Sequence, residues 1–259
     1  MQFGICAAVE SAGDLKAAGA DFVEENVQTL LQGQVDDAQW NGLERLRGAA
    51  LPVLAANALL PGGLKIVGPS LDLQGLRKYV SCVFRRAQLA GIKILVFGSA
   101  AARNVPEGFN HQAAREQIVE FLNMATPLAA EQGITLVAEP LSRRESNIIN
   151  SVSEAMFYVK RVNHPNFRCL VDSYHFWVDD DSLEDLKLAM PWIAHVHVAD
   201  KGGRLAPGEG GTSDYKPFFR VMKQAEYPGA ISVEAMEFID FKNTAPRVIS
   251  FLKRAWQEA

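Results

Sequence analysis

Short apolar runs alternate with longer amphipathic segments along the whole chain, and Gly, Pro or Asn residues separate them. Apolar runs of about five residues are typical of strands that are buried on both faces of a parallel sheet. Segments with apolar residues at every third or fourth position predict helices that cover such a sheet. The predicted strands are Gln2–Cys6, Asp21–Glu25, Leu51–Ala55, Lys93–Phe97, Thr135–Glu139, Arg168–Asp172, Ile193–Val198 and Ala230–Glu234.

The intervening helices have recognisable ends. Leu71–Leu89 and Gln112–Gln132 carry apolar residues at helical spacing and predict two long helices. Ser153 precedes another helical pattern and is a suitable N-cap. Gly91 and Gly133 each lie between a predicted helix and the next strand, where a C-cap glycine is expected.

Eight strands that alternate with helices predict an α/β fold, a closed (β/α)₈ or TIM barrel. Dividing 259 residues by eight gives about 32 residues per unit, the size of a strand–helix repeat. The alternative is an open doubly wound sheet, but no GxGxxG motif follows the first strand. Because the chain shows no linker or composition shift, we expect one domain over residues 1–259. Loops after strands form the active-site face of a barrel, and long ones are predicted at Asn57–Ser70, Gly98–Asn110 and Lys201–Ser213.

The composition, with 48% hydrophobic and 22% charged residues, is that of a globular protein and excludes extended disorder. A net charge of −4 without runs of like charge argues against a surface for nucleic acid or anionic membrane. The N-terminus has no signal-peptide pattern, and no apolar stretch is long enough to span a membrane. We interpret the widely separated Cys6, Cys82 and Cys169 as buried thiols of a reducing compartment, and we expect a cytoplasmic protein.

Ionisable residues lie at the ends of the later apolar strands. Glu139, Asp172 and Glu234 each close a strand, and the HVH sequence places His195 and His197 in another. Ionising a carboxylate among buried neighbours is costly unless a cation or hydrogen bonds compensate. Because parallel strands end on the same face of a barrel, two Glu, one Asp and one His predict a divalent-cation site there.

Each of these residues alone also has an ordinary structural interpretation. A strand-end Glu is more often a helix cap or an ion-pair partner, and a strand His is more often a hydrogen-bonded structural residue. The coincidence on four successive strands favours the metal site. Glu24 and Glu25, near the end of the second strand, are either pocket residues or solvated loop charges.

Further candidates lie in the loops after the strands. His175, three residues after Asp172, either lies in the loop near the metal or caps the next helix. Arg204, after the seventh strand, is either a cation for a substrate oxygen or a mobile surface residue. Asn57 and Arg103 could contact hydroxyls or a phosphate, although each alone is typical of a solvent-facing side chain.

The chain resembles the sugar phosphate isomerase/epimerase superfamily of xylose isomerase-like TIM barrels, which includes ketose 3-epimerases and hydroxypyruvate isomerase. Four stretches carry the resemblance: VAEPLSRRESNIINSVSEA, CLVDSYHFWVDD, IAHVHVAD and GEGGTSDYKPFFRVMKQAEYPGAISVEA. The resemblance implies metal ligands at Glu139, Asp172, His197 and Glu234.

The resemblance also implies roles in catalysis. In ketose 3-epimerases the two glutamates transfer protons, which implies this role for Glu139 and Glu234. It implies that His175 and Arg204 bind substrate oxygens, and we place His195 with them because it points into the same space as His197. The implied cofactor is a divalent ion; we expect Mn²⁺, with Mg²⁺, Co²⁺ and Zn²⁺ as alternatives.

We therefore expect a sugar epimerase or aldose–ketose isomerase that acts on a ketose or related keto-polyol. One glutamate would remove a proton beside the carbonyl to give a metal-stabilised enediolate. Proton return to the opposite face would be epimerisation, and return to the adjacent carbon would be isomerisation. The expected partner is a small carbohydrate, with no nucleic acid and no membrane, and family analogy favours a homo-oligomer.

Three alternatives stay open at this stage. A lyase or dehydratase acting on a keto-sugar or inosose would begin with the same proton removal and then eliminate a group. A metal-dependent phosphodiesterase shares this barrel, but five histidines and an acidic chain argue against it. A non-catalytic binding subunit is disfavoured because all four ligand positions are present.

Overall fold

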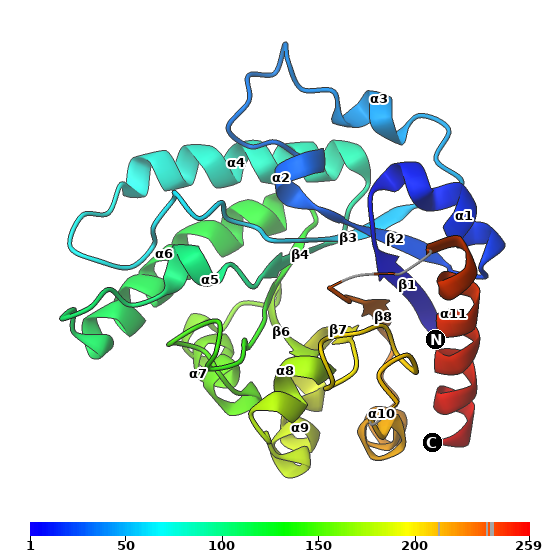
Figure 1. The fold of residues 1–259 in the computed structure, drawn as a ribbon. Coiled ribbons are helices and arrows are strands. Elements are labelled where there is room, and N and C mark those ends of the chain that lie inside the picture. The colour runs from blue at the N-terminus through cyan, green and yellow to red at the C-terminus, as the bar shows by residue number, and fades with distance from the viewer. Residues whose placement is uncertain (212, 237, 239–240) are drawn as a thin grey trace.

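The computed structural model describes residues 1–211, 213–236, 238 and 241–259. Eight parallel strands pair in chain order, and the eighth pairs with the first, so the barrel is closed (Figure 1). The predicted single-domain (β/α)₈ barrel is confirmed. The strands are β1 (Gln2–Cys6), β2 (Phe22–Asn26), β3 (Val53–Asn57), β4 (Ile94–Phe97), β5 (Thr135–Ala138), β6 (Phe167–Asp172), β7 (Ile193–Val198) and β8 (Ala230–Val233).

The strand ends differ from the prediction in a way that matters for the site. β5 and β8 stop one residue before Glu139 and Glu234. The Glu139 N–H still donates to the Phe97 carbonyl oxygen at 3.2 Å, and the Glu234 N–H donates to the Val198 carbonyl oxygen at 3.1 Å. These hydrogen bonds keep both glutamates in register at the mouth of the barrel.

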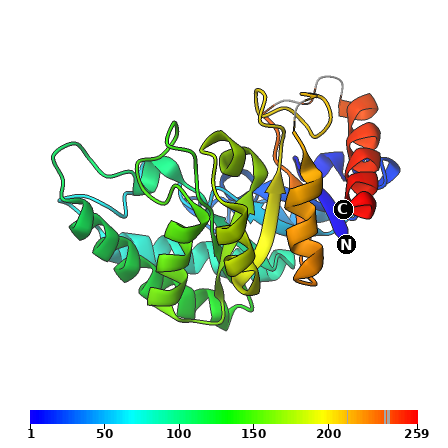
Figure 2. The ribbon, with the colours of Figure 1, turned by 90° about the horizontal axis from the view of Figure 1, so that it is seen from below.

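Helices surround the barrel (Figures 1 and 2). The long helices α4 and α6 pack against each other, and α11 contacts β1, which brings the C-terminus near the N-terminus. None of the described helices is long and apolar enough to cross a membrane. The helices are α1 (Ala12–Ala17), α2 (Val27–Leu30), α3 (Gly42–Leu46), α4 (Leu73–Ala90), α5 (Ala100–Arg103), α6 (His111–Glu131), α7 (Val152–Val162), α8 (Ser173–Val178), α9 (Leu183–Ala189), α10 (Tyr215–Gln224) and α11 (Phe241–Glu258).

The predicted helix ends are partly right. Gly91 is the C-cap of α4 with φ of 78°, as expected. Gly133 follows the C-cap residue of α6 rather than being it. The N-cap of α7 is Ser151, not Ser153, because the Ser151 hydroxyl oxygen accepts the Glu154 N–H at 3.1 Å. Ser153 therefore lies inside the first turn of α7.

The structure also differs from the prediction at the long loops. The first begins after Asn57, which is the last residue of β3, and the second contains the one-turn helix α5. The third, Lys201–Ser213, includes Thr212, which lies outside the described residues. Of the cysteines, Cys169 is buried as expected, whereas Cys6 and Cys82 are only partly buried.

The main hydrophobic core lies between the barrel and its helices, and a small separate cluster of Val96, Val137 and Leu170 lies apart from it. These three residues come from neighbouring strands at positions whose strand neighbours face the main core, so they point into the barrel. The ionisable side chains described below occupy the remaining interior toward the carboxyl ends of the strands.

Candidate active site

Four predicted ligand residues meet at the carboxyl ends of β5 to β8. Glu139, Asp172, His197 and Glu234 each offer one ligand atom, and these atoms lie within 4.8 Å of one another. The Nδ1 atom of His197 is 3.1 Å from Glu139 Oε1 and 3.3 Å from Glu234 Oε2. Asp172 Oδ1 accepts the Tyr174 N–H at 2.8 Å as the N-cap of α8, which turns Oδ2 toward the cluster.

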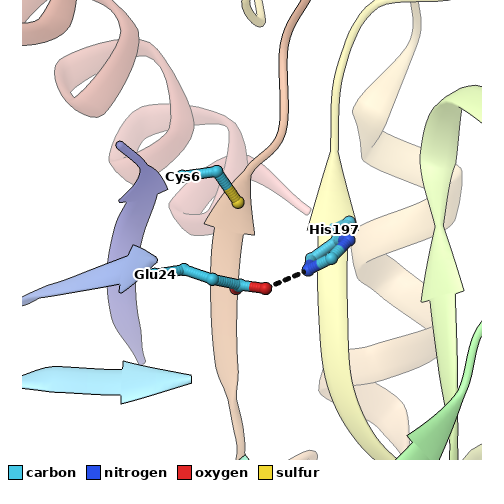
Figure 3. Close-up of side chains that lie close together, drawn as sticks. All are labelled: Cys6, Glu24 and His197. Carbon is cyan, nitrogen blue, oxygen red and sulfur yellow. Dashed lines mark hydrogen bonds and ion pairs between the residues drawn. The ribbon is translucent and has the colours of Figure 1, made fainter. Parts of the chain in front are cut away.

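Glu24 lies beneath this cluster and is fully buried. Its Oε1 accepts the Nε2–H of His197 at 2.9 Å, and its Oε2 accepts the Nε2–H of His195 at 2.7 Å. Figure 3 shows Glu24 reaching from β2 toward His197 on β7. Because a carboxylate only accepts hydrogen bonds, Glu24 fixes the ring of His197 with Nε2–H on its own side and Nδ1 facing the cluster.

His195 lies one layer deeper than the four clustered residues. It is fully buried, and its Nε2 atom contacts Glu24 and, at 3.3 Å, the hydroxyl of Ser232. Its Nδ1 atom has no hydrogen-bond partner within the described part of the chain. His195 was expected to contact the substrate, but it hydrogen-bonds Glu24 and is not one of the four clustered residues.

His175 lies in α8, not in a loop, and Asp172 rather than His175 caps that helix. The Nδ1 atom of His175 accepts the Ser142 N–H at 3.1 Å, so its Nε2 atom carries the ring proton. That Nε2 atom is 3.6 Å from Asp172 Oδ2 and has no hydrogen-bond partner among the residues that the structure describes. This buried N–H donor lies beside the cluster, where it could donate a hydrogen bond to an oxygen atom of a substrate.

Arg204 is held against the cluster and is not a mobile surface residue. Its guanidinium donates to Asp172 Oδ2 at 3.2 Å and to Glu234 Oε2, and it lies 5.1 Å above the ring of Tyr174. Burial lowers the pKa of Arg204, but the charges of Asp172 and Glu234 outweigh this effect and raise it. Arg204 therefore stays charged at the mouth of the barrel.

The two glutamates of the cluster differ in proton affinity. Burial, and then the charge of Glu234, raise the pKa of Glu139. Burial also acts to raise the pKa of Glu234, but His197 and Arg204 outweigh it and lower that pKa to about 2. For His197, burial acts to lower the pKa, but Glu24 and Glu234 outweigh it and raise the pKa well above its ordinary value. The acidic cluster thus attracts positive charge.

The cluster fits a divalent ion by the chemistry of its donors. Three carboxylates and one imidazole suit Mn²⁺, Mg²⁺, Co²⁺ or Zn²⁺, and the Glu24 contact directs the Nδ1 atom of His197 toward them. Cys6, Glu24 and His197 also lie within 4.8 Å of one another (Figure 3). Both oxygens of Glu24 already accept histidine N–H groups, so this second group is a hydrogen-bonded support rather than a second ion site.

A cavity of about 370 Å³ lies beside the cluster at the ends of β1 to β3, a volume suited to a small molecule. It is lined by Cys6, Ala7, Ala8, Glu24, Glu25, Asn26, Thr29, Arg45 and Asn57. A larger cavity of about 630 Å³ lies between α4 and residues 33–37, and no residue of the acidic cluster lines it.

Sequence reasoning missed three contributions to the site. Glu24 was left ambiguous, because residues of both parities in β2 are buried and the alternation of the strand does not show which side chains face inward. Asn57 was interpreted as solvent-facing, but its side-chain N–H donates to Glu234 Oε1 at 2.8 Å. Arg103 received the same interpretation and is fully buried, so that prediction is wrong. Burial lowers the pKa of Arg103 to about 10, against the opposing charge of Glu139.

Comparison with known proteins identifies the class. The family model of the xylose isomerase-like TIM barrel matches residues 13–255, and this chain belongs to that family. The L-ribulose 3-epimerase of a Methylomonas species is 28% identical over 236 residues, which are 87% of this chain and 78% of that protein. The 3-dehydro-D-guloside 4-epimerase of Escherichia coli is 26% identical over 204 residues, 75% of this chain and 77% of that protein.

Solved structures show the same fold. D-psicose 3-epimerase from Clostridium cellulolyticum, determined with D-tagatose, superposes with a TM-score of 0.86 and 17% identity, covering 99% of both chains. The IOLI protein with a bound zinc atom superposes with a TM-score of 0.73 and 21% identity, covering 98% of this chain and 96% of that one. The two relatives matched by sequence are an L-ribulose 3-epimerase and a 3-dehydro-D-guloside 4-epimerase, which supports an isomerase and does not favour elimination.

Proposed function

We propose that this protein is a divalent-metal-dependent epimerase or isomerase of a ketose or related keto-polyol. The observation that carries the proposal is the cluster of Glu139, Asp172, His197 and Glu234 at the mouth of the barrel. The family and its sugar epimerase relatives support the same class of reaction.

The four clustered residues would hold the ion, and Mn²⁺ is our expected occupant. A bound divalent ion would supply positive charge next to the substrate carbonyl and its neighbouring hydroxyl, which acidifies the C–H between them. His197 would ligate through Nδ1, because Glu24 accepts the proton on Nε2.

Glu139 and Glu234 would move the proton. Both carboxylates lie next to Nδ1 of His197, so both border the same reaction volume. One glutamate would take the proton from carbon to leave an enediolate, and the other would return a proton from its own side. Asn57 orients Glu234 through the hydrogen bond to Oε1, which leaves the Oε2 atom for the cluster.

His175 and Arg204 would bind and orient the substrate. The Nε2–H of His175 is a buried donor without a partner in the described structure, and a substrate hydroxyl or carbonyl oxygen would complete its hydrogen bonding. Arg204 lies between Asp172 and Glu234, where its charge would stabilise negative charge that develops on the substrate oxygen. The adjacent cavity of about 370 Å³ would hold the rest of a small sugar.

Solvent deuterium incorporation tests the proposal. Ketoses and keto-polyols are incubated in heavy water with the Mn²⁺-loaded protein, and deuterium at the carbon beside the carbonyl is read by mass spectrometry. The proposal expects incorporation without loss of mass as water or an aglycone. Glu139→Gln and Glu234→Gln should each abolish it while largely preserving the fold. Normal exchange by both variants would show that these residues are not the proton-transfer groups.

A further inference from the structure

Glu139 lies in a space that one glycine leaves open. Gly98 follows β4, and a Cβ atom at this position would overlap Oε2 of Glu139. The backbone of Gly98 is not in the left-handed region, so its conformation is one that other residues adopt. The requirement for glycine at position 98 is therefore the volume taken by the Glu139 carboxyl group.

Arg103 holds the backbone that carries the same glutamate. It lies at the end of the one-turn helix α5 and is fully buried. Its guanidinium donates to the Phe97 carbonyl oxygen at 2.9 Å, to the Glu139 carbonyl oxygen at 2.7 Å and to the Ile149 carbonyl oxygen at 3.4 Å. One side chain thus joins the ends of β4 and β5 to the loop before α7.

Among the residues that the structure describes, this buried guanidinium bonds only to carbonyl oxygens, which is costly because none of these partners is a carboxylate that would offset its charge. Its planar group can reach several acceptors at fixed angles, which a lysine ammonium does not reproduce. Arg103 therefore does more than fill space in the core. Its hydrogen bonds fix the position of the backbone at Glu139.

We propose that residues 97–103, FGSAAAR, form a seat for Glu139, in which Gly98 provides room for the carboxylate and Arg103 is a positioning residue. This inference rests on the proposed function, because it assigns the seat to ion binding and proton transfer by Glu139. Outer residues that orient a metal ligand typically change metal affinity about 10- to 100-fold when they are mutated.

Two variants and two matched controls test the seat. Arg103→Lys keeps the charge but cannot span three carbonyl oxygens. Gly98→Ala displaces the Glu139 carboxylate without backbone strain. Arg86→Lys is the control, because Arg86 is also fully buried and donates to the carbonyl oxygens of Leu31, Gln32 and Val35, away from the cluster; unlike Arg103, it also donates to the Asp37 carboxylate at 2.8 Å. Gly13→Ala is the second control, since its Cβ atom would meet open space.

The readouts are Mn²⁺ affinity by calorimetry, thermal unfolding without ion, and the deuterium exchange rate. Arg103→Lys and Gly98→Ala should bind Mn²⁺ about 10- to 100-fold more weakly and exchange more slowly. Arg86→Lys should lose thermal stability as Arg103→Lys does, but it should bind Mn²⁺ like the wild type. Gly13→Ala should match the wild type in both ion affinity and exchange.

The outcomes separate this inference from the proposed function. If the wild type binds Mn²⁺ while Arg103→Lys and Gly98→Ala bind it equally well, the seat is overturned and the proposed function stands. If Arg103→Lys does not fold, Gly98→Ala alone decides, because its change is confined to the carboxylate. If the wild type binds no divalent ion, the proposed function fails, and this inference fails with it.

Discussion

Replacing Glu24 with glutamine should weaken ion binding without touching a ligand. The Glu24 carboxylate accepts the Nε2–H groups of both His195 and His197. A glutamine amide offers one oxygen acceptor and one NH₂ donor, so it can accept from only one of them. If the amide NH₂ faces His197, that ring must move its proton to Nδ1, the atom that faces the acidic cluster.

The size of the effect follows from these contacts. Loss of an outer carboxylate that orients a ligating histidine typically costs about 10- to 100-fold in metal affinity, or about 1.4 to 2.8 kcal/mol. Loss of one buried hydrogen bond to a charged group should lower the free energy of unfolding by about 1.5 to 3 kcal/mol. Burial raises the pKa of Glu24, but the two histidines outweigh it and hold that pKa well below its ordinary value.

Isothermal titration calorimetry with Mn²⁺ and urea unfolding of the ion-free protein measure the two effects separately. Glu25→Gln is the matched control, because Glu25 is the adjacent buried carboxylate on β2. Its oxygens instead accept the Val9 N–H at 2.7 Å and the Thr29 hydroxyl at 2.9 Å. The control should lose stability but keep Mn²⁺ affinity. Wild-type affinity in Glu24→Gln would refute the role given to Glu24 in orienting His197.

Three more predictions concern substrate, loop and proton. His175→Leu should raise KM about five-fold, because losing one hydrogen bond to the substrate costs roughly 1 kcal/mol. The Mn²⁺ affinity should not change. An unaltered KM would exclude a substrate contact. Tyr215→Phe removes the hydroxyl that donates to the buried Asp200 at 2.9 Å and should lower the free energy of unfolding in urea by about 1 to 3 kcal/mol, whereas no change would contradict the bond. Because the pKa of His197 is raised, Mn²⁺ must displace a proton from this ring when it binds. The Mn²⁺ affinity should therefore increase with pH. Calorimetry in buffers of different ionisation enthalpy should show the proton release. A pH-independent affinity would contradict that last prediction.

The barrel could be predicted because parallel strands covered by helices are apolar on both faces. Runs such as Thr135–Ala138 stand out against amphipathic helices such as α4. The exact ends could not be predicted, since Glu139 and Glu234 continue the hydrogen-bond ladder by one bond beyond the assigned strands. The apolar pattern alone does not show whether Glu139 and Glu234 are the last residues of their strands or the first residues after them.

The residues of the candidate site that lie in strands could be predicted from the sequence. Asp172 and His197 lie in strands, so their position followed from the pattern and the family resemblance. Arg103 was not predictable in the same way, because its partners Glu139 and Ile149 lie 36 and 46 residues away and loops carry no periodicity. Such contacts become visible only once the barrel has brought the loops together.

Anomalous diffraction from crystals grown with Mn²⁺ would show directly which residues hold the ion. We expect one strong anomalous peak bonded to Glu139, Asp172, Nδ1 of His197 and Glu234, with Glu24 still on the far side of the histidine ring. A fully ordered site without an anomalous peak, or a peak held by other residues, would contradict this expectation.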